Sequence, residues 1–273
     1  MSVELHGFSR RTQFAAAVDD ILRGAAMWPI WLALSWEEFK RTYSRSILGF
    51  LWVTLSFAGF VFVKLLVFSS MLSTPDQQYY NAYLVSGFFI WQFISSSVSS
   101  APAVFVGSQA WIKNDALPLS LYVYKMVARE FYNLVLTSFV VVAAFLYLGF
   151  SPGPYAWMTI PAIALILLNA VWVKILLGIV GTRHRDVEHL VRAVMFAMLF
   201  LVPIFWLPEQ IGGLYDYLWW NPILHFMQIF RNPLIDQQIE WQYWIFAGAV
   251  TVIGMTVTLI AYALGRRRIV FWF

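Results

Sequence analysis

The sequence contains no cysteine, so disulfides, thiolate metal sites and a cysteine nucleophile are excluded. Charged residues are also scarce: they make up 12% of the 273 residues, whereas about 25% is usual in soluble domains. Hydrophobic residues make up 61%. A chain of this composition cannot cover its apolar surface with polar groups. We therefore predict an all-α integral membrane protein whose solvent is the bilayer.

Several motifs that would carry chemistry are missing too. No lysine is followed by serine or threonine, so the chain has no phosphate-binding loop of the GxxxxGK[ST] kind. No carboxylate lies deep in a predicted span, and Glu130, interpreted as shallow, is the nearest; this argues against a proton- or sodium-coupled carrier. The N-terminus lacks a basic start, a short apolar run and a small-residue cleavage site, so we expect no cleaved signal peptide.

Long apolar segments predict six transmembrane helices in a single domain of residues 1–273, because about 20 apolar residues cross the hydrocarbon core. The predicted spans are residues 47–72, 83–106, 127–150, 155–180, 190–207 and 241–265. Residues 12–36 show an amphipathic period interrupted at Pro29, which favours an N-terminal helix lying in the membrane interface over one packed on a soluble partner. Residues 208–240 are too broken to span and suit a periplasmic re-entrant region.

The basic residues predict the orientation, because cytoplasmic loops of membrane proteins carry an excess of lysine and arginine. Only Arg231 falls on the side that we assign to the periplasm, while Lys64 and Lys174 lie within spans. The basic residues assigned to the cytoplasm are Arg10, Arg11, Arg23, Lys40, Arg41, Arg45, Lys113, Lys125, Arg129, Arg183, Arg185, Arg192, Arg266, Arg267 and Arg268. Both termini are therefore expected in the cytoplasm, and Lys174 is expected to reach the headgroups from the inner end of its span. A net charge of +4, sorted by loop in this way, does not argue for a nucleic-acid partner.

The segment at residues 39–52 carries a basic stretch, a Tyr-x-x-Ser, a Leu-Gly pair and a tryptophan that opens the first span. It resembles the entry motif of the ABC-2 type permeases that export polysaccharides, the membrane subunits of O-antigen, capsule and teichoic-acid exporters. The resemblance places Tyr43, Arg45, Leu48 and Gly49 at the gate of the channel entrance.

The resemblance also implies partners and cargo. A permease of this kind works in a bacterial inner membrane as a homodimer with two ATP-binding subunits, which hold the ATP and Mg²⁺. Its cargo is a polysaccharide linked to a polyprenyl diphosphate, O-antigen being favoured, and the cargo moves from cytoplasm to periplasm. The chain itself is then expected to hold no cofactor and to catalyse no reaction.

Two cytoplasmic segments, residues 107–120 and 182–189, resemble those that dock onto the ATPase in this family. Their candidate coupling residues are Trp111, Asn114, Leu117, Pro118, Arg183 and Asp186. Without the family context, the first segment reads as a plain connecting loop. His184 and His189 have a spacing that a metal could use, but no carboxylate or cysteine completes a convincing ligand set, so we expect no metal site.

Aromatic residues make up 19% of the chain, and several fall in mid-span: Trp52, Phe57, Phe60, Phe196 and Phe200. Their rings could stack on the apolar faces of sugars, which suits a sliding polymer, although contacts with lipid or with other helices stay open for each ring. Lys64 either snorkels outward or faces the lumen, where it would meet an anionic lipid headgroup. The polar run at residues 95–100 is interpreted as close helix packing in preference to a substrate site.

Two other functions compete with polysaccharide export. An ABC-2 exporter of a small molecule or a lipid would share the entry motif but has less use for so many aromatic residues. A membrane-embedded glycosyltransferase acting on lipid-linked sugars would need a carboxylate motif at the membrane surface, and the sequence contains no Asp-x-Asp.

Overall fold

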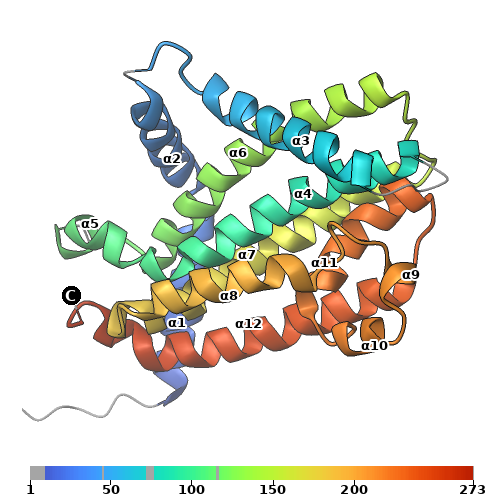
Figure 1. The fold of residues 1–273 in the computed structure, drawn as a ribbon. Helices are drawn as coiled ribbons and strands as arrows, with labels where there is room; N and C mark the ends of the chain where they lie inside the picture. Colours follow the sequence, from blue (N-terminus) through green and yellow to red (C-terminus); the bar gives the residue numbers. More distant parts are fainter. Residues whose placement is uncertain (1–9, 45, 72–76, 115–116, 273) are drawn as a thin grey trace, which may run out of the picture.

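The computed structural model describes residues 10–44, 46–71, 77–114 and 117–272, and within these ranges the chain forms helices and turns but no strand. Arg45 lies outside the described residues, as does the predicted end of the first span at Leu72. The long helices lie alongside one another, with α1, α5 and the C-terminus toward one end and α9 and α10 toward the other (Figure 1). The long helices are α3 (Leu51–Met71), α4 (Gln77–Ser100), α6 (Leu119–Leu148), α7 (Thr159–Arg183) and α12 (Trp241–Ile269).

Among the described residues, four helical segments are long and apolar enough to cross a membrane: Gln77–Ala103, Leu119–Leu148, Ala156–Arg183 and Trp241–Ile269. Two further helices are not among these four. α3 has 21 residues, of which the apolar segment Leu51–Val67 is described with its side chains, and α8 (Val187–Leu201) has 15 residues. At about 1.5 Å per residue, α8 is roughly 22 Å long, against a hydrocarbon core of about 30 Å. These helices are those of a multi-pass membrane protein. That the chain crosses the membrane six times stays a prediction.

The ends of α6 explain why it differs from the predicted span at residues 127–150. Pro118, which has no N–H to donate, precedes the first residue of the helix, Leu119. The rest of the protein buries the first turns of this helix. It ends at Gly149, whose φ of +67° is a left-handed conformation that glycine adopts without strain. Residues 119–126, which the predicted span at 127–150 leaves out, are therefore part of this helix.

The predicted interface helix at residues 12–36 is two helices. α1 (Arg10–Ala26) and α2 (Trp28–Tyr43) are separated at Met27, and Pro29 stands in the first turn of α2, where its missing N–H costs nothing. α1 packs against α6 and α12, whereas α2 packs against α6.

Asp20 of α1 is the centre of a buried polar cluster at this end of the molecule. Its carboxylate accepts hydrogen bonds from the backbone N–H groups of Leu119 at 3.1 Å and Ser120 at 3.0 Å, so it caps the first turn of α6. It also accepts a 2.6 Å bond from the Tyr262 hydroxyl and pairs with Arg266 at 2.9 Å. One buried carboxylate thus joins three helices that are far apart in the sequence.

α2 is held on α6 by a second group of charges. Glu38 pairs with Lys125 at 2.7 Å and with Arg129 at 2.8 Å. Burial alone would raise the pKa of the Glu38 carboxyl, but the hydrogen bonds and charges of Lys125 and Arg129 outweigh burial and lower it below its ordinary value. Phe39 and Trp36 add ring contacts with Tyr132 of α6, at 5.7 and 5.5 Å between centroids.

The region at residues 208–240 folds into short helices: α9 (Pro208–Ile211), α10 (Leu214–Leu218), α11 (Pro222–Arg231) and a wide turn at Asn232–Asp236. The side chain of Asn221 caps α11 by accepting the N–H of Ile223 at 3.0 Å. α11 is buried from Leu224 to Arg231 and packs against α4, α7 and α12. It therefore lies inside the bundle and not along its surface, and its re-entrant placement in the membrane stays a prediction.

A buried ion pair joins the middle of the bundle. The ammonium of Lys174 on α7 lies 2.8 Å from the carboxylate of Glu130 on α6. It also donates to the backbone carbonyl of Ser97 at 2.8 Å and to the hydroxyl of Ser100 at 2.9 Å, both on α4. Lys174 is fully buried, so the expectation that it snorkels is wrong. Glu130 is 7% exposed, and its depth in the membrane stays a prediction.

Replacing Asp20 with alanine should destabilise the protein by about 3 kcal/mol, since removing one partner of a buried ion pair leaves the other groups uncompensated. The neighbouring Asp19 is the matched control: its side chain is 62% exposed and pairs with Arg23 of the next turn, so Asp19→Ala should cost less than about 0.5 kcal/mol. Thermal unfolding of both variants in detergent measures the difference, and equal losses would contradict the role given to Asp20.

The Lys174–Glu130 pair predicts strong coupling in a double-mutant cycle. Lys174→Met and Glu130→Gln should each cost about 3–5 kcal/mol, because each leaves a buried group without its partner. The double variant replaces both charges and should recover most of that loss. Additive losses in detergent unfolding would show that the two residues act independently.

Candidate functional site

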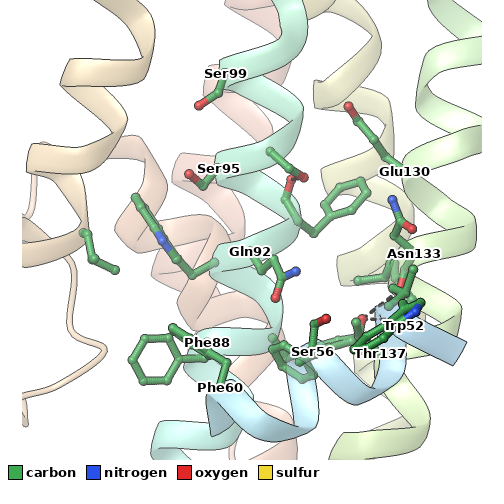
Figure 2. Close-up of a pocket in the computed structure, with 18 of the residues that line it drawn as sticks. Trp52, Ser56, Phe60, Phe88, Gln92, Ser95, Ser99, Glu130, Asn133 and Thr137 are labelled. Carbon is green, nitrogen blue, oxygen red and sulfur yellow. Dashed lines mark hydrogen bonds between the residues drawn. The ribbon is translucent and has the colours of Figure 1, made fainter. Parts of the chain in front are cut away.

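A cavity of about 760 Å³ opens between α3, α4 and α6. This volume lies within the range of about 300–1,000 Å³ that is common for small-molecule sites. The lining residues include Tyr43 from α2, Trp52, Ser56, Phe57 and Phe60 from α3, Phe88, Phe89, Gln92, Ser95, Ser96 and Ser99 from α4, Glu130, Asn133 and Thr137 from α6, and Leu199 from α8. Figure 2 shows the side chains converging from three of these helices.

One wall of the cavity is aromatic and comes from α3 and the middle of α4. The rings of Phe60 and Phe88 meet edge to face with centroids 4.9 Å apart, and Phe57 meets Phe89 at 6.5 Å. Trp52 lies on α3 two turns before Phe60 and is half exposed. Edge-to-face pairs fix the ring planes, so this wall is a stable apolar surface.

A polar wall rises along α4. Gln92, Ser95, Ser96 and Ser99 stand at i, i+3, i+4 and i+7, which brings them to one face of the helix (Figure 2). The polar run at residues 95–100 is therefore divided in the structure: Ser97 and Ser100 contact Lys174, while the serines at 95, 96 and 99 line the cavity.

α6 completes the polar wall with Glu130, Asn133 and Thr137. The second carboxylate oxygen of Glu130, Oε2, and the amide oxygen of Asn133, Oδ1, are buried and have no hydrogen-bond partner within the described part of the chain. Buried acceptors are nearly always paired, and an unpaired one costs about 1–3 kcal/mol. Both oxygens can accept hydrogen bonds from hydroxyl donors of a bound molecule.

Three of the five predicted channel rings meet in this cavity, namely those of Trp52, Phe57 and Phe60. The other two do not line it. Phe196 and Phe200 lie on α8, where they are 69% and 58% exposed and contact each other at 5.9 Å between centroids.

Lys64 points inward from α3 toward rings. Its ammonium lies 5.4 Å from the ring centroids of Phe60 and Phe205 and 5.8 Å from that of Phe88, distances at which a cation is attracted to the ring face. The residue is half-buried and is not among those that line the cavity. Both expectations for Lys64, snorkelling toward the outer headgroups and facing the lumen, stay predictions.

The predicted gate residues lie at the junction of α2 and α3. Tyr43, the last residue of α2, lines the cavity. Leu48 and Gly49 occupy the turn that follows, and Gly49 has a φ of +55°, a conformation that favours glycine. Arg45 is outside the described residues.

Four of the six predicted coupling residues are exposed at the end of the bundle where α5 lies (Figure 1). Trp111 and Asn114 belong to α5 (Gln109–Asn114), and Arg183 and Asp186 lie at the turn between α7 and α8. The other two face inward: Pro118 is buried and Leu117 is half-buried at the start of α6.

The polar wall is the part of the site that the sequence analysis missed. A signal was present, because Glu130, Asn133 and Thr137 share one face of a helix at i, i+3 and i+7, as do the polar residues of α4. The polar run of α4 was instead interpreted as close helix packing, and the polar face of α6 was not singled out in its apolar context.

Comparison with known proteins identifies relatives of the whole bundle. Residues 30–235, well over half of the chain, match the ABC-2 type transporter family. Two proteins of Klebsiella pneumoniae, each described as "O-antigen export system permease protein RfbA", are 24% and 23% identical to this chain over 231 residues. Each alignment covers 81% of this chain and 87% of the relative, and both names describe permeases and not enzymes. The chain therefore belongs to the ABC-2 type transporter family, as a membrane permease.

Proposed function

We propose that this chain is the transmembrane subunit of an ABC transporter that exports a polysaccharide linked to polyprenyl diphosphate, of the O-antigen type, from cytoplasm to periplasm. Two relatives named as O-antigen export permeases support the choice of cargo. The cavity between α3, α4 and α6 is the place where the chain would contact the glycan.

The observation that carries this proposal is the pairing of an aromatic wall with a polar wall in one cavity. A pyranose ring presents apolar C–H faces and a rim of hydroxyl groups. The rings of Trp52 and Phe60 offer stacking surfaces, while Gln92, Asn133 and Glu130 offer hydrogen-bonding groups. A lipid or a hydrophobic small molecule would use the aromatic wall but would leave the buried oxygens of α6 unpaired.

The energy for export would come from a separate subunit, because the chain has no phosphate-binding loop. In this proposal two copies of the permease assemble with two ATP-binding subunits, which hold the ATP and Mg²⁺. The exposed residues Trp111, Asn114, Arg183 and Asp186 would contact those subunits, and Tyr43, Leu48 and Gly49 would control the entrance.

The proposed location is a bacterial inner membrane, with both termini in the cytoplasm. The charges of the helix ends support this orientation. Arg266, Arg267 and Arg268 end α12, and Arg183 ends α7, at the same end of the bundle as α5 (Figure 1). The excess of positive charge there is typical of the cytoplasmic side.

Loss of either wall should reduce export. Trp52→Ala and Phe60→Ala each remove a ring from the cavity, and Asn133→Leu replaces an amide with an apolar side chain of similar size. If each contact contributes about 1 kcal/mol in the rate-limiting step, each variant should export about five- to tenfold less polymer. The measurement is the amount of surface polysaccharide in cells with equal permease levels.

The matched control for these variants is Phe139→Ala, on α6 but 62% exposed and outside the cavity, which should leave export unchanged. Normal export by all three cavity variants would remove this cavity from the polymer path. Normal surface polysaccharide in a strain lacking the permease would overturn the proposed function itself.

The absence of cysteine makes the orientation directly testable, since each introduced cysteine is the only reactive thiol. Gln238→Cys and Arg185→Cys both place it at an exposed position. A membrane-impermeant maleimide should label position 238 in intact spheroplasts and position 185 only after permeabilisation, and the unmodified chain should not react. The reverse pattern would invert the proposed orientation.

A further inference from the structure

A second cavity, of about 550 Å³, lies at the other end of the molecule from α5. The start of α4, the short helices after α8, the wide turn after α11 and the start of α12 enclose it. Its lining residues are Tyr79, Tyr83, Pro208, Tyr215, Gln228, Asn232, Ile235, Asp236, Gln237, Gln238, Glu240 and Tyr243. No function considered so far uses these residues.

The tyrosines of this cavity are fixed by hydrogen bonds. The hydroxyl of Tyr79 donates to Asp236 Oδ1 at 2.6 Å, and the hydroxyls of Tyr215 and Tyr243 are 3.0 Å apart. The amide nitrogen of Asn232 donates to Glu240 Oε1 at 2.8 Å. These bonds join α4, α10, α12 and the wide turn, so the cavity has preorganised walls.

Two side-chain oxygens in these walls have no partner. Gln228 is 6% exposed and Asn232 is 2% exposed, and neither Gln228 Oε1 nor Asn232 Oδ1 forms a hydrogen bond with any residue that the structure describes. Both residues line the cavity. Both oxygens are hydrogen-bond acceptors, so a ligand that pairs with them must contain hydrogen-bond donors.

The charges of the lining residues also restrict the charge that a ligand can carry. Asp236 and Glu240 are carboxylates, and no lysine or arginine lines the cavity. The nearest cation on α11 is Arg231, which is fully buried with its guanidinium 3.8 Å from the ring centroid of Tyr83. Tyr83 lines the cavity and Arg231 does not. An anionic ligand would meet carboxylates here, whereas an uncharged ligand with hydroxyl groups would meet acceptors and tyrosine rings.

Residues of α4 line both cavities. Tyr83 lines the second cavity and Phe88 lines the first, and five residues of helix separate them by about 7.5 Å along the axis. This rise is comparable to the length of one or two sugar units. Five residues also turn the helix by about 140°, so the two cavities lie on different faces of α4 and are separate sites.

We infer that the second cavity is a binding site for an uncharged pyranose unit of the exported glycan, on the periplasmic side of the permease. The inference rests on the proposed function for its choice of cargo. The sugar hydroxyls would donate to Gln228 Oε1 and Asn232 Oδ1, and the tyrosine rings would cover the sugar face.

Saturation-transfer NMR on the full-length protein in nanodiscs tests the site without any need for export. The probes are the methyl glycosides of glucose, galactose, mannose, rhamnose and N-acetylglucosamine, with methyl glucuronide as the anionic counterpart. At least one neutral glycoside should receive saturation from the protein. Its signal should fall at least fivefold in Gln228→Leu and in Tyr215→Phe, and the glucuronide should receive none.

Tyr217→Phe is the matched control, because Tyr217 stands on the same short helix as Tyr215 but is 80% exposed and does not line the cavity. Its signal should equal that of the unmodified chain. Tyr215→Phe removes the hydroxyl that lies 3.0 Å from that of Tyr243 and so releases the ring of Tyr243 from its fixed position, which reports on the site even where Gln228→Leu folds poorly. Absence of saturation for every neutral glycoside, equal saturation of the glucuronide, or a signal that neither variant reduces would each overturn the inference.

The two proposals fail separately. If Trp52→Ala and Asn133→Leu reduce export as predicted while Gln228→Leu leaves the glycoside signal unchanged, the export function stands and the second site is wrong. If the second site binds glycosides as described but surface polysaccharide does not depend on the permease, the site stands as a sugar site and the proposed cargo route is wrong.

Discussion

Lys174 and Glu130 fix the rotation of three long helices relative to one another. The lysine on α7 reaches the carboxylate of α6 and two oxygen acceptors of α4, so all three of its donors are used. A buried ammonium without these partners would cost several kcal/mol, and rotating any of the three helices would break the set. The faces that α4 and α6 turn toward α3 follow from this constraint, and these faces form the polar wall of the first cavity.

The same ion pair explains how a carboxylate can line a cavity without acting as a proton-coupling site. One oxygen of Glu130 binds Lys174, and the other has no partner among the residues that the structure describes. The pair is neutral overall, so a glycan in the cavity, as proposed, would meet an acceptor and not a net charge. Hydrogen bonds of this kind contribute about 1 kcal/mol each, which suits a polymer that has to be held and released repeatedly. The aromatic wall acts in the same way, because a ring face has no preferred partner along a sugar chain.

The sequence was sufficient to predict helices, their approximate positions and the basic end of the bundle, because hydrophobic periodicity and loop charge are local properties. It was not sufficient for partners that only tertiary structure brings together. Lys174 was taken for a snorkelling residue, yet α7 continues to Arg183, nine residues and about 14 Å farther along the axis. Asp20 lies within the segment interpreted as an interface helix, yet it caps a helix that begins about a hundred residues later. In both cases a buried polar group was indistinguishable by sequence from an exposed one.

Asp20 and Lys174 stabilise two different parts of the bundle. At the basic end, Asp20 ties α1 to α6 and α12, and Glu38 ties α2 to α6, so a force applied to α1 or α2 is passed to α6 through charged contacts and not through apolar packing alone. α6 carries Glu130 and Asn133 of the first cavity farther along its length. A movement imposed at the basic end would therefore reach the polar wall through one continuous helix, whereas α3, with its aromatic wall, packs mainly against α4 and α6.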